Sequence, residues 1–492
     1  MPVNYFDNSK SKTGLSVLAS AIKEYDKKNR ILIDVGDTIQ GSPLMYFHHI
    51  NQKKYDNPVA KIMNELDYDF FIPGNHDFNY GKEYLADFTD SLNAKTLCQN
   101  IYCDEKLIFD NGYEIIDKNG IKLLIVGVTT KYIPNWENPA FIEGYTFADP
   151  YLETKKIVEK YRETVDLVVV AYHGGLEKYL HSQKEFVKDT GENQAFKIFS
   201  EIKGIDILLT GHQHRVICDK IDNRICIMAG FNGSHLGVIE VEYEDGVKDI
   251  NAKLVLATSY SSDEKCVELL NPIESANQIF LDEVIGIVPD NNLSINDPIT
   301  ARIEKHPIVD FINNIQLDAS KAMLSATSLA NIVTGFDKEI TVRNVLSTYV
   351  YSNTLVVVSI TGEILKEYLE KCAEYFIVKD EKIVANPRFS YPKLEHYNYD
   401  MIDGIDYTID LTKPFGSRLT SIKYKNQEIN QEDDFTLVLN NYRATGGGDF
   451  FMLKDLPIIR EIPFNVAELM LDYIRKNHII KVENKKNIKL IT

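Results

Sequence analysis

The sequence predicts an α/β protein with two domains and a helical connector between them. A chain of 492 residues is too long for a single hydrophobic core. In its first half, short β-branched apolar runs alternate with helical patterns, which is typical of layered α/β folds. Over residues 267–288, apolar and acidic residues recur at helical spacing instead, and Pro298 follows them. We therefore predict a first domain over residues 1–258, a helical linker over 259–298 and a second domain over 299–492.

The first domain is expected to alternate helices and strands. Residues Gly14–Lys28 carry apolar side chains at helical spacing with charged side chains between them. A second helix is expected over Tyr46–Leu66. The predicted strands are short apolar runs, and each is followed by glycine or polar residues: Arg30–Val35, Phe70–Gly74, Val165–Tyr172 and Ile205–Thr210.

The second domain is expected to have α+β character. Helical spacing of apolar residues predicts helices over His306–Leu324 and Ile364–Phe376. Runs rich in β-branched residues predict strands over Leu355–Ile360 and Phe435–Leu439.

Composition limits the kinds of partner. The formal charge of -18 argues against general binding to nucleic acid, because no basic face is available for phosphates. No apolar stretch approaches about 20 residues, so no membrane span is expected. Six cysteines show no C-x-x-C pair; Cys98 with Cys103, or Cys218 with Cys226, could form a bridge, but scattered thiols are the favoured interpretation.

Four predicted strands end in loops whose polar residues are typical metal ligands. The loops contain Asp37, Asn75 with His76 and Asp77, His173, and His212 with His214. Loops after separate strands converge at the carboxyl ends of the strands in layered α/β folds, which is where metal and phosphate sites collect. A single histidine after a strand is usually a surface group, but four such loops favour a shared site.

The donor atoms of these loops suit divalent cations. Asp37 can bridge two cations through its two oxygens, and Asn75 offers a neutral oxygen. His212 and His214 alternate by one residue, so in extended backbone they would point the same way and serve neighbouring metals. The mixed oxygen and nitrogen set suits Mn, Fe or Zn better than Mg or Ca. Two such cations would activate water for attack on phosphorus, with His76 oriented by Asp77 as the catalytic pair.

The four loops resemble a known family. G-D-T-I-Q-G-S-P, G-N-H-D-F-N-Y-G, H-G-G and G-H-Q-H, in this order, look like the calcineurin-like metallophosphoesterase domain of the 5'-nucleotidase family. The later N-N-Y-R-A-T-G-G-G-D-F is similar to the nucleotide-binding domain of that family. The resemblance implies a four-layer α/β/β/α first domain, two divalent metal ions, and hydrolysis of nucleotide phosphoesters by a monomer in nucleotide catabolism. It implies the metal ligands Asp37, Asn75, His173, His212 and His214, and the catalytic residues His76 and Asp77.

Two branches of the family compete. The stretch Leu324–Asn331 lacks the arginine of the N-x-G-G-x-R motif that 5'-nucleotidases usually carry. Residues 397–404 and Asn441–Ala444 instead resemble 2',3'-cyclic-nucleotide 2'-phosphodiesterase/3'-nucleotidases, in which two tyrosines sandwich the base. The resemblance places these at Tyr442 and at Tyr397, with the adjacent Tyr399 as the alternative for the latter. Gly446 and Gly447 would allow close approach to the substrate. A 5'-nucleotidase is the alternative function.

The chain departs from the family at its N-terminus. None of the eleven histidines has an aspartate two residues before it, so the D-x-H motif of the first strand is missing and one metal site is expected to be weakened. Met1–Phe6 resembles the stretch just after that motif. Three hypotheses follow: the start of the chain is misassigned or trimmed, the chain is an inactive fragment, or it binds nucleotide without catalysis. Family members are mostly extracellular, periplasmic or in the cell wall, and the N-terminus shows no export signal.

Overall fold

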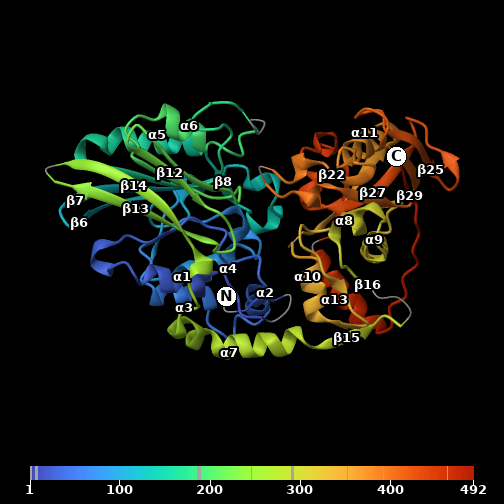
Figure 1. Ribbon diagram of the computed structural model, residues 1–492, viewed down its shortest axis with the longest axis horizontal. Helices are drawn as coiled ribbons and strands as arrows, with labels where there is room; N and C mark the ends of the chain where they lie inside the picture. The colour runs from blue at the N-terminus through green and yellow to red at the C-terminus, as the bar shows by residue number, and fades with distance from the viewer. Residues whose placement is uncertain are drawn as a thin grey trace. The chain divides into compact units, whose positions relative to one another are not determined.

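The computed structural model divides the chain into two compact units, Met1–Asn277 (unit 1) and Gln278–Thr492 (unit 2) (Figure 1). Met1, Pro2 and Phe6 of the N-terminal stretch, and residues 290–292 of the predicted linker, lie outside the residues that the structure describes. The described residues are 3–5, 9–185, 190–244, 246–289, 293–351, 353–391, 393–462 and 464–492.

Unit 1 is built around a six-stranded sheet with the strand order β11-β12-β10-β9-β7-β6. The four inner strands run parallel, whereas β6 and β11 at the two edges are antiparallel to their neighbours. Its strands are β6 (Tyr113–Lys118), β7 (Ile121–Thr129), β9 (Leu167–His173), β10 (Ile207–Thr210), β11 (Val216–Ile221) and β12 (Arg224–Ala229).

A smaller parallel sheet lies against the large one. It has the order β1-β2-β3, with β1 at Ile33–Asp34, β2 at Phe70–Phe71 and β3 at Lys95–Thr96. The remaining strands of unit 1 form a hairpin of β13 (His235–Tyr243) with β14 (Val247–Leu256), and a small sheet of β4 (Ile101–Cys103), β5 (Lys106–Leu107) and β8 (Tyr145–Phe147).

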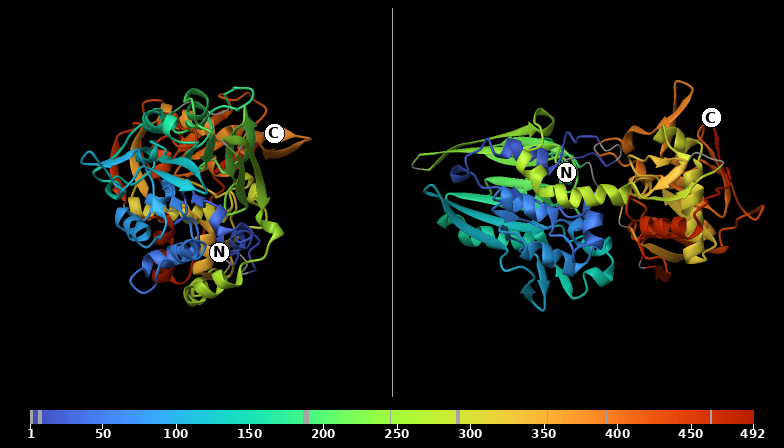
Figure 2. Two further views of the ribbon diagram at one scale, coloured as in Figure 1. Left: turned by 90° about the vertical axis from the view of Figure 1, so that its left-hand side faces the viewer. Right: turned by 90° about the horizontal axis from the view of Figure 1, so that it is seen from below.

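Successive side chains of β9 point to opposite faces of the large sheet and pack into two different hydrophobic cores. Val168 and Val170 pack with the helices α5 (Pro150–Tyr161) and α6 (Ala195–Glu201). Val169, on the other face of the strand, packs with Phe70 and Ile72 beside the smaller sheet. A third core packs the far face of that smaller sheet against α1 (Leu15–Ile22), α3 (Pro58–Glu65) and α4 (Lys82–Asp90). This order of layers confirms the predicted α/β/β/α architecture (Figures 1 and 2).

The helix predicted over Tyr46–Leu66 is two helices, α2 (Pro43–Ile50) and α3. Asn57 ends the connecting turn because its side chain accepts hydrogen bonds from the N–H groups of Val59 and Ala60, and Pro58 occupies the first helical position. The first predicted helix is also shorter, since α1 ends at Ile22. Local capping therefore corrects the helix boundaries that periodicity alone predicted.

Unit 2 contains a five-stranded sheet with the order β23-β17-β27-β20-β28. Two of its strands confirm the predicted runs, β20 (Leu355–Thr361) and β27 (Asp434–Asn440), and the others are β17 (Leu324–Ser328), β23 (Asp400–Asp403) and β28 (Ile458–Ile462). Two predicted helices are found as α9 (Pro307–Ser320) and α11 (Gly362–Ala373). The other helices of the unit are α8 (Pro298–Ile303), α10 (Val342–Thr348), α12 (Asn441–Ala444) and α13 (Val466–Asn477).

Smaller sheets complete unit 2. A four-stranded sheet has the order β26-β25-β24-β29, and three strand pairs accompany it. These strands are β24 (Asp406–Asp410), β25 (Leu419–Tyr424), β26 (Gln427–Glu428), β29 (Ile488–Ile491), and the pairs β15 (Val284–Ile287) with β19 (Glu339–Thr341), β16 (Leu293–Ser294) with β18 (Gly335–Phe336), and β21 (Phe376–Lys379) with β22 (Lys382–Ala385).

A buried ion cluster lies inside unit 2. The ammonium of Lys305 contacts the carboxylates of Asp310 and Asp403, and both carboxylate side chains are fully buried. Lys485 contacts Asp403 at 2.7 Å, and the Nζ of Lys305 also donates to Asn487 at 2.5 Å. The cluster therefore joins α9 and β23 to the C-terminal segment that leads into β29.

The predicted linker contains the helix α7 (Glu264–Leu281), within which the boundary between the two units falls. The helical spacing predicted up to residue 288 is wrong at its end, because Val284–Ile287 form the strand β15. All six cysteines are free thiols, so neither candidate bridge is present. Within the described ranges, none of the helices combines the length and the apolar character that crossing a membrane requires.

Candidate metal centre

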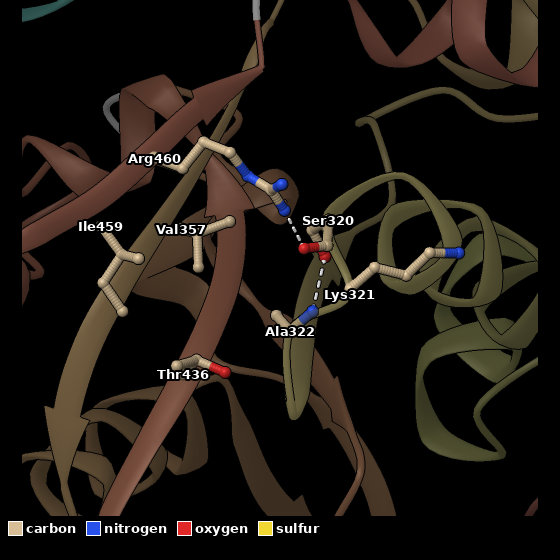
Figure 3. Close-up of a pocket in the computed structure, with 7 residues that line it drawn as sticks. All are labelled: Ser320, Lys321, Ala322, Val357, Thr436, Ile459 and Arg460. Atoms are coloured by element: carbon tan, nitrogen blue, oxygen red, sulfur yellow. Dashed lines mark hydrogen bonds between the residues drawn. The ribbon is translucent and has the colours of Figure 1, made fainter.

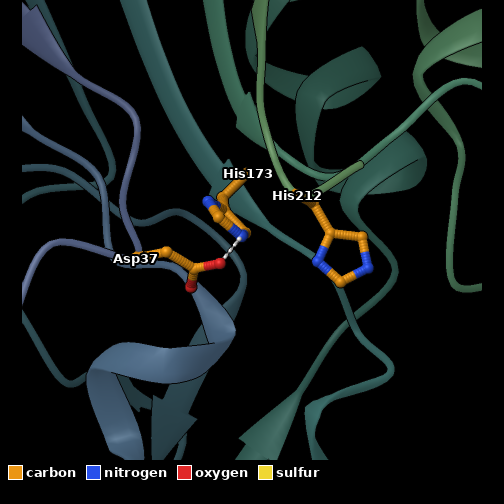
Figure 4. A group of neighbouring side chains, drawn as sticks. All are labelled: Asp37, His173 and His212. Carbon is orange, nitrogen blue, oxygen red and sulfur yellow. Dashed lines mark ion pairs between the residues drawn. The ribbon is translucent and has the colours of Figure 1, made fainter. Parts of the chain in front are cut away.

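Four side chains predicted as ligands converge at the carboxyl ends of strands. Asp37 follows β1, Asn75 begins the 3₁₀ helix Asn75–Phe78 after β2, His173 is the last residue of β9, and His212 follows β10. Figure 4 shows Asp37, His173 and His212 around a common point. Parallel pairing aligns the carboxyl ends of β1 and β2 within the smaller sheet, and those of β9 and β10 within the large sheet.

The distances between the donor atoms fit a shared cation. Asp37 Oδ2 lies 3.2 Å from His173 Nε2, and Asn75 Oδ1 lies 3.2 Å from the same nitrogen. Asn75 Oδ1 is also 2.9 Å from His212 Nδ1. Ligand atoms that each lie about 2.1 Å from one cation are about 3–3.5 Å from one another. One carboxylate, one amide oxygen and two imidazoles therefore form a set that can hold a divalent transition metal ion.

Asp37 is ionised at this site. Burial opposes its ionisation, but the neighbouring His173, His76 and His212 hold the pKa of its carboxyl well below the ordinary value. Its Oδ1 accepts a hydrogen bond of 2.8 Å from the backbone N–H of His76, which leaves Oδ2 toward His173. The carboxylate is thus fixed in the orientation that a metal ligand requires.

Two glycines let the ligand loops meet backbone to backbone. A Cβ atom on Gly36 would lie 2.3 Å from the nitrogen of Gly74. A Cβ atom on Gly74 would lie 2.3 Å from Asp37 Oδ1 and 2.6 Å from Cε1 of His173. Side chains at these positions would separate the loops, so both glycines are required by close approach.

The structure corrects the predicted role of Asp77. This carboxylate is fully buried and accepts hydrogen bonds from four backbone N–H groups, whereas the His76 ring is hydrogen-bonded to Asn79. The donors are the N–H groups of Gly74 at 2.7 Å, Asp37 at 2.8 Å, Thr38 at 2.7 Å and Ile39 at 3.0 Å. Asp77 therefore fastens the loop of Asp37 to the loop of Asn75 and does not orient His76.

Asn79 contacts the His76 imidazole instead. His76 Nδ1 lies 2.8 Å from Asn79 Oδ1, and Asn79 Nδ2 donates to Glu137 Oε2 at 2.6 Å. Residues three apart share a face of a 3₁₀ helix, whereas consecutive residues point apart. A helical interpretation of the loop would have found Asn79 from the sequence. Burial raises the pKa of Glu137.

His214 lies outside the converging group. Its ring stacks on Phe231 with the centroids 5.1 Å apart and an angle of 20° between the planes. The predicted extended backbone is wrong, because His212 and His214 both have positive φ, 68° and 58°. Alternation on an extended strand therefore does not carry both rings to the same side.

Sequence reasoning also missed residues that support the ligands. The Glu192 carboxylate lies 2.8 Å from His212 Nε2, and the only tryptophan, Trp136, stacks on the His212 ring at 5.3 Å. Asp34 is a half-buried neighbour of Asp37, and desolvation raises its pKa. Gln213 joins the two histidine loops through both backbone groups of Leu176, at 3.0 and 2.9 Å.

The predicted tyrosine pair lies in unit 2. The rings of Tyr397 and Tyr442 are 6.4 Å apart, and the angle between their planes is 73°. A base sandwiched between two rings needs them nearly parallel and about 7 Å apart, so one ring must turn before it can stack on a base from the opposite side. The alternative Tyr399 is fully buried and stacks on Tyr375 at 4.9 Å, which makes it a core residue.

The glycine turn after Tyr442 supports that ring. Gly446 has a φ of +86°, and a Cβ on Gly447 would lie 2.6 Å from Cζ of Tyr442. The buried Arg443 donates to the carbonyls of Gly447 and Tyr397, and its Nε lies 2.6 Å from Asp400 Oδ2. Arg443 thus joins the backbone segments of the two tyrosines.

A separate cavity of about 330 Å³ in unit 2 contains no predicted site residue (Figure 3). Arg460 donates to the carbonyl of Ser320 across it. Its lining residues are Ser320, Lys321, Ala322, Val357, Thr436, Ile459 and Arg460.

Comparison with known proteins shows to which class of protein the chain belongs. Residues 13–216 match the model of the calcineurin-like phosphoesterases, so unit 1 is a metallophosphoesterase domain and the chain is a hydrolase of that class. Residues 284–455 match the model of the 5'-nucleotidase C-terminal domain. The crystal structure named "Putative 5'-Nucleotidase from Staphylococcus aureus in complex with alpha-ketoglutarate" is 31% identical with a TM-score of 0.90, over 99% of this chain and 96% of that one. The chain belongs to the 5'-nucleotidase family.

Relatives with described activities are more distant in sequence. A 2',3'-cyclic-nucleotide 2'-phosphodiesterase/3'-nucleotidase of Haemophilus influenzae is 26% identical over 96% of this chain and 81% of its own length. The trifunctional nucleotide phosphoesterase protein YfkN of Bacillus subtilis is 27% identical over 96% of this chain. The chain spans only 36% of the length of that protein.

Proposed function

We propose that the chain hydrolyses phosphoesters of nucleotides, with 2',3'-cyclic nucleotides and 3'-nucleotides as its preferred substrates. The main support for the proposed reaction, hydrolysis of a phosphoester, is a convergence of side chains within the metallophosphoesterase domain. The converging residues are Asp37, Asn75, His173 and His212. The name of the Haemophilus influenzae relative, and the absence of an arginine from Leu324–Asn331, support the substrate preference.

The proposed cofactors are two divalent cations such as Mn, Zn or Fe. Asp37, Asn75, His173 and His212 would hold one of them. Asp37 and His214 would serve the second, more weakly bound cation, with the ring of His214 released from its stack on Phe231. When bound, the cations supply a Lewis acid that neutralises phosphoryl charge and activates water.

His76 is the proposed proton donor. Its Nδ1–H donates to Asn79 Oδ1, and Asn79 is itself oriented by Glu137. With Nδ1–H engaged in this way, Nε2 is the atom that would take up a second proton, and the resulting imidazolium would pass that proton to the departing oxygen. Asp77 acts on this step only by fixing the loop from which His76 projects.

Tyr397 and Tyr442, with Gly446 and Gly447, are the proposed nucleoside site. Stacking on tyrosine is compatible with any base, since every base has a π face worth about 1–3 kcal/mol. We expect Tyr442→Ala to raise KM about ten-fold with little change in kcat. The matched control is Tyr391→Ala, which removes a tyrosine that is 65% exposed in the same unit.

A substrate assay tests the preference. The full chain, supplied with Mn²⁺, should hydrolyse 2',3'-cyclic AMP and 3'-AMP with kcat/KM at least about ten-fold above that for 5'-AMP. His173→Ala should lose both activity and bound metal, whereas the exposed His181→Ala should keep them. A preference for 5'-AMP would overturn the proposed substrate but not the reaction class.

A 5'-nucleotidase is the second candidate. The structural similarity to the Staphylococcus aureus protein, which covers nearly all of both chains, favours it. The same three-substrate assay separates the two candidates. Binding of nucleotide without turnover by the metal-loaded chain would instead support a protein that binds nucleotide without catalysis.

A further inference from the structure

One short segment, residues 192–195, contacts both histidine loops of the metal centre. The carboxylate of Glu192 lies 2.8 Å from His212 Nε2. The side chain of the next residue, Asn193, accepts a hydrogen bond of 3.0 Å from the N–H of Gly175, two residues after His173. Ala195 N–H donates to the carbonyl of the same glycine at 2.9 Å. The segment thus joins the loops that end β9 and β10.

The position of Glu192 is set independently of the histidine. Its backbone carbonyl accepts hydrogen bonds from Thr130 Oγ1 at 2.7 Å and from the Tyr172 hydroxyl at 3.2 Å. Both donors belong to residues that are fully buried in the large-sheet region of unit 1. The protein scaffold therefore presents the Glu192 carboxylate to His212.

This contact selects the nitrogen with which His212 can bind a cation. A carboxylate only accepts hydrogen bonds, so Nε2 carries the ring proton and Nδ1 keeps its lone pair. Nδ1 is the atom that lies 2.9 Å from Asn75 Oδ1 in the converging set. His173 is arranged in the opposite sense, because its Nδ1–H donates to the carbonyl of Val35 at 2.5 Å and leaves Nε2 free for the cation.

The ring of His212 is also held from the side. Trp136 stacks on it with 25° between the planes, so Glu192 and Trp136 together restrict both the tilt and the rotation of the imidazole. Glu192 cannot share the cation held by Nδ1, because it contacts the opposite side of the ring.

We propose that Glu192 is a positioning residue that fixes His212 as an Nδ1 ligand of the metal centre. The proposal rests on the proposed metal-dependent function. Carboxylates that accept the second N–H of a metal-binding histidine typically change metal affinity by about 10–100-fold. Glu192 contributes this effect from the segment 190–195, in which none of the proposed ligands lies.

The test measures metal binding directly. Isothermal titration of the metal-free full chain with Mn²⁺ should show about 10–100-fold weaker binding for Glu192→Ala than for the unchanged chain. Glu192→Gln should recover most of the affinity, because its amide oxygen still accepts the Nε2 proton. Glu201→Ala is the matched control, since Glu201 is exposed on α6, outside the site.

A spectroscopic measurement separates positioning from general damage. The visible absorption of bound Co²⁺ should change in Glu192→Ala but not in Glu192→Gln or Glu201→Ala, while the unfolding temperature without metal stays the same in all of them. Equal Mn²⁺ affinity and an unchanged Co²⁺ spectrum in Glu192→Ala would overturn the proposal while leaving the proposed function intact. Failure of the unchanged chain to bind Mn²⁺ or Co²⁺ would overturn both.

Discussion

Asp77 and His76 are adjacent in the chain, yet their side chains have different surroundings. The Asp77 carboxylate is fully buried and receives four backbone N–H groups from two loops. The His76 ring is partly exposed and contacts Asn79. Asp77 therefore holds the two loops of the site together, whereas the ring of His76 is accessible to a substrate.

Replacing each of the two residues should separate these roles. Asp77→Ala leaves buried N–H groups without an acceptor, so we expect the free energy of unfolding to fall by about 3 kcal/mol or more. His76→Ala should change that free energy by less than about 0.5 kcal/mol while turnover is lost. Urea unfolding and steady-state kinetics check both variants. Similar stabilities for the two would show that the Asp77 hydrogen bonds do not stabilise the loops.

The convergence of the four candidate ligands could be predicted from the sequence, whereas the residues that support them could not. Asp37, Asn75, His173 and His212 each follow an apolar strand, and parallel strands bring their ends together. Asn79 depends on the loop being a 3₁₀ helix, which three polar residues in a row did not reveal. Glu192 reaches His212 across 20 residues, from a loop that has no periodic pattern.

At the scale of elements, capping and turn residues set helix boundaries that the apolar periodicity did not predict. The apolar pattern continues through Tyr46–Leu66, but Asn57 and Pro58 divide it into α2 and α3. The order of the layers was expected only through the resemblance to the family, and of the strands of the large sheet the apolar runs predicted β9 and β10 alone. The positive φ of His212 and His214 had no such signal in the sequence.

Helix α2 carries a buried histidine that should make unit 1 sensitive to acid. His48 is 4% exposed; its Nε2–H donates to the carbonyl of Tyr55 at 3.1 Å, and its Nδ1 accepts from the Tyr84 hydroxyl at 2.6 Å. Burial lowers the pKa of His48, although the Tyr55 carbonyl and Asp56 oppose the shift. The neutral ring is thus fully hydrogen-bonded in the folded state.

The direction in which pH changes the stability follows from the difference between the pKa of His48 in the folded and the unfolded chain. The unfolded chain protonates His48 near its ordinary pKa of about 6.5, whereas the folded chain resists protonation. Its stabilising contribution is complete above about pH 6.5 and is lost as the pH falls toward the lowered folded pKa. Urea unfolding at pH 7.5 and 5.5 should show a smaller loss of stability in His48→Gln than in the unchanged chain. The exposed His181→Gln should behave like the unchanged chain, and an identical loss in all three would exclude His48 as a source.

At the scale of the whole molecule, the two units have separate means of stabilisation. Unit 1 contains the candidate metal centre, and unit 2 contains the buried cluster of Lys305, Asp310 and Asp403. Each unit has its own sheet and core elements. We therefore expect each to respond to its own perturbation.

Calorimetry of the full chain should show this independence. Mn²⁺ at about 100 times its dissociation constant should stabilise unit 1 by about 2.7 kcal/mol and leave the transition of unit 2 in place. Lys305→Ala leaves the buried carboxylate of Asp310 without its ammonium and leaves Asp403 with Lys485 alone, so it should destabilise unit 2 by about 3–5 kcal/mol and leave the other transition in place. The exposed Lys321→Ala is the control. A single transition that shifts as a whole in both experiments would contradict separate unfolding.

The contact between Gly36 and Gly74, together with the four amides on Asp77, has a consequence for how an ion arrives. These interactions join protein atoms to protein atoms, so we expect them to hold the loops of Asp37 and Asn75 together before an ion enters. An arriving ion therefore meets ligands that have already lost their conformational freedom, and little of its binding energy goes into ordering loops. Different transition metals should then exchange in one rigid frame, where ionic radius and preferred coordination geometry, not refolding, decide which ion is kept.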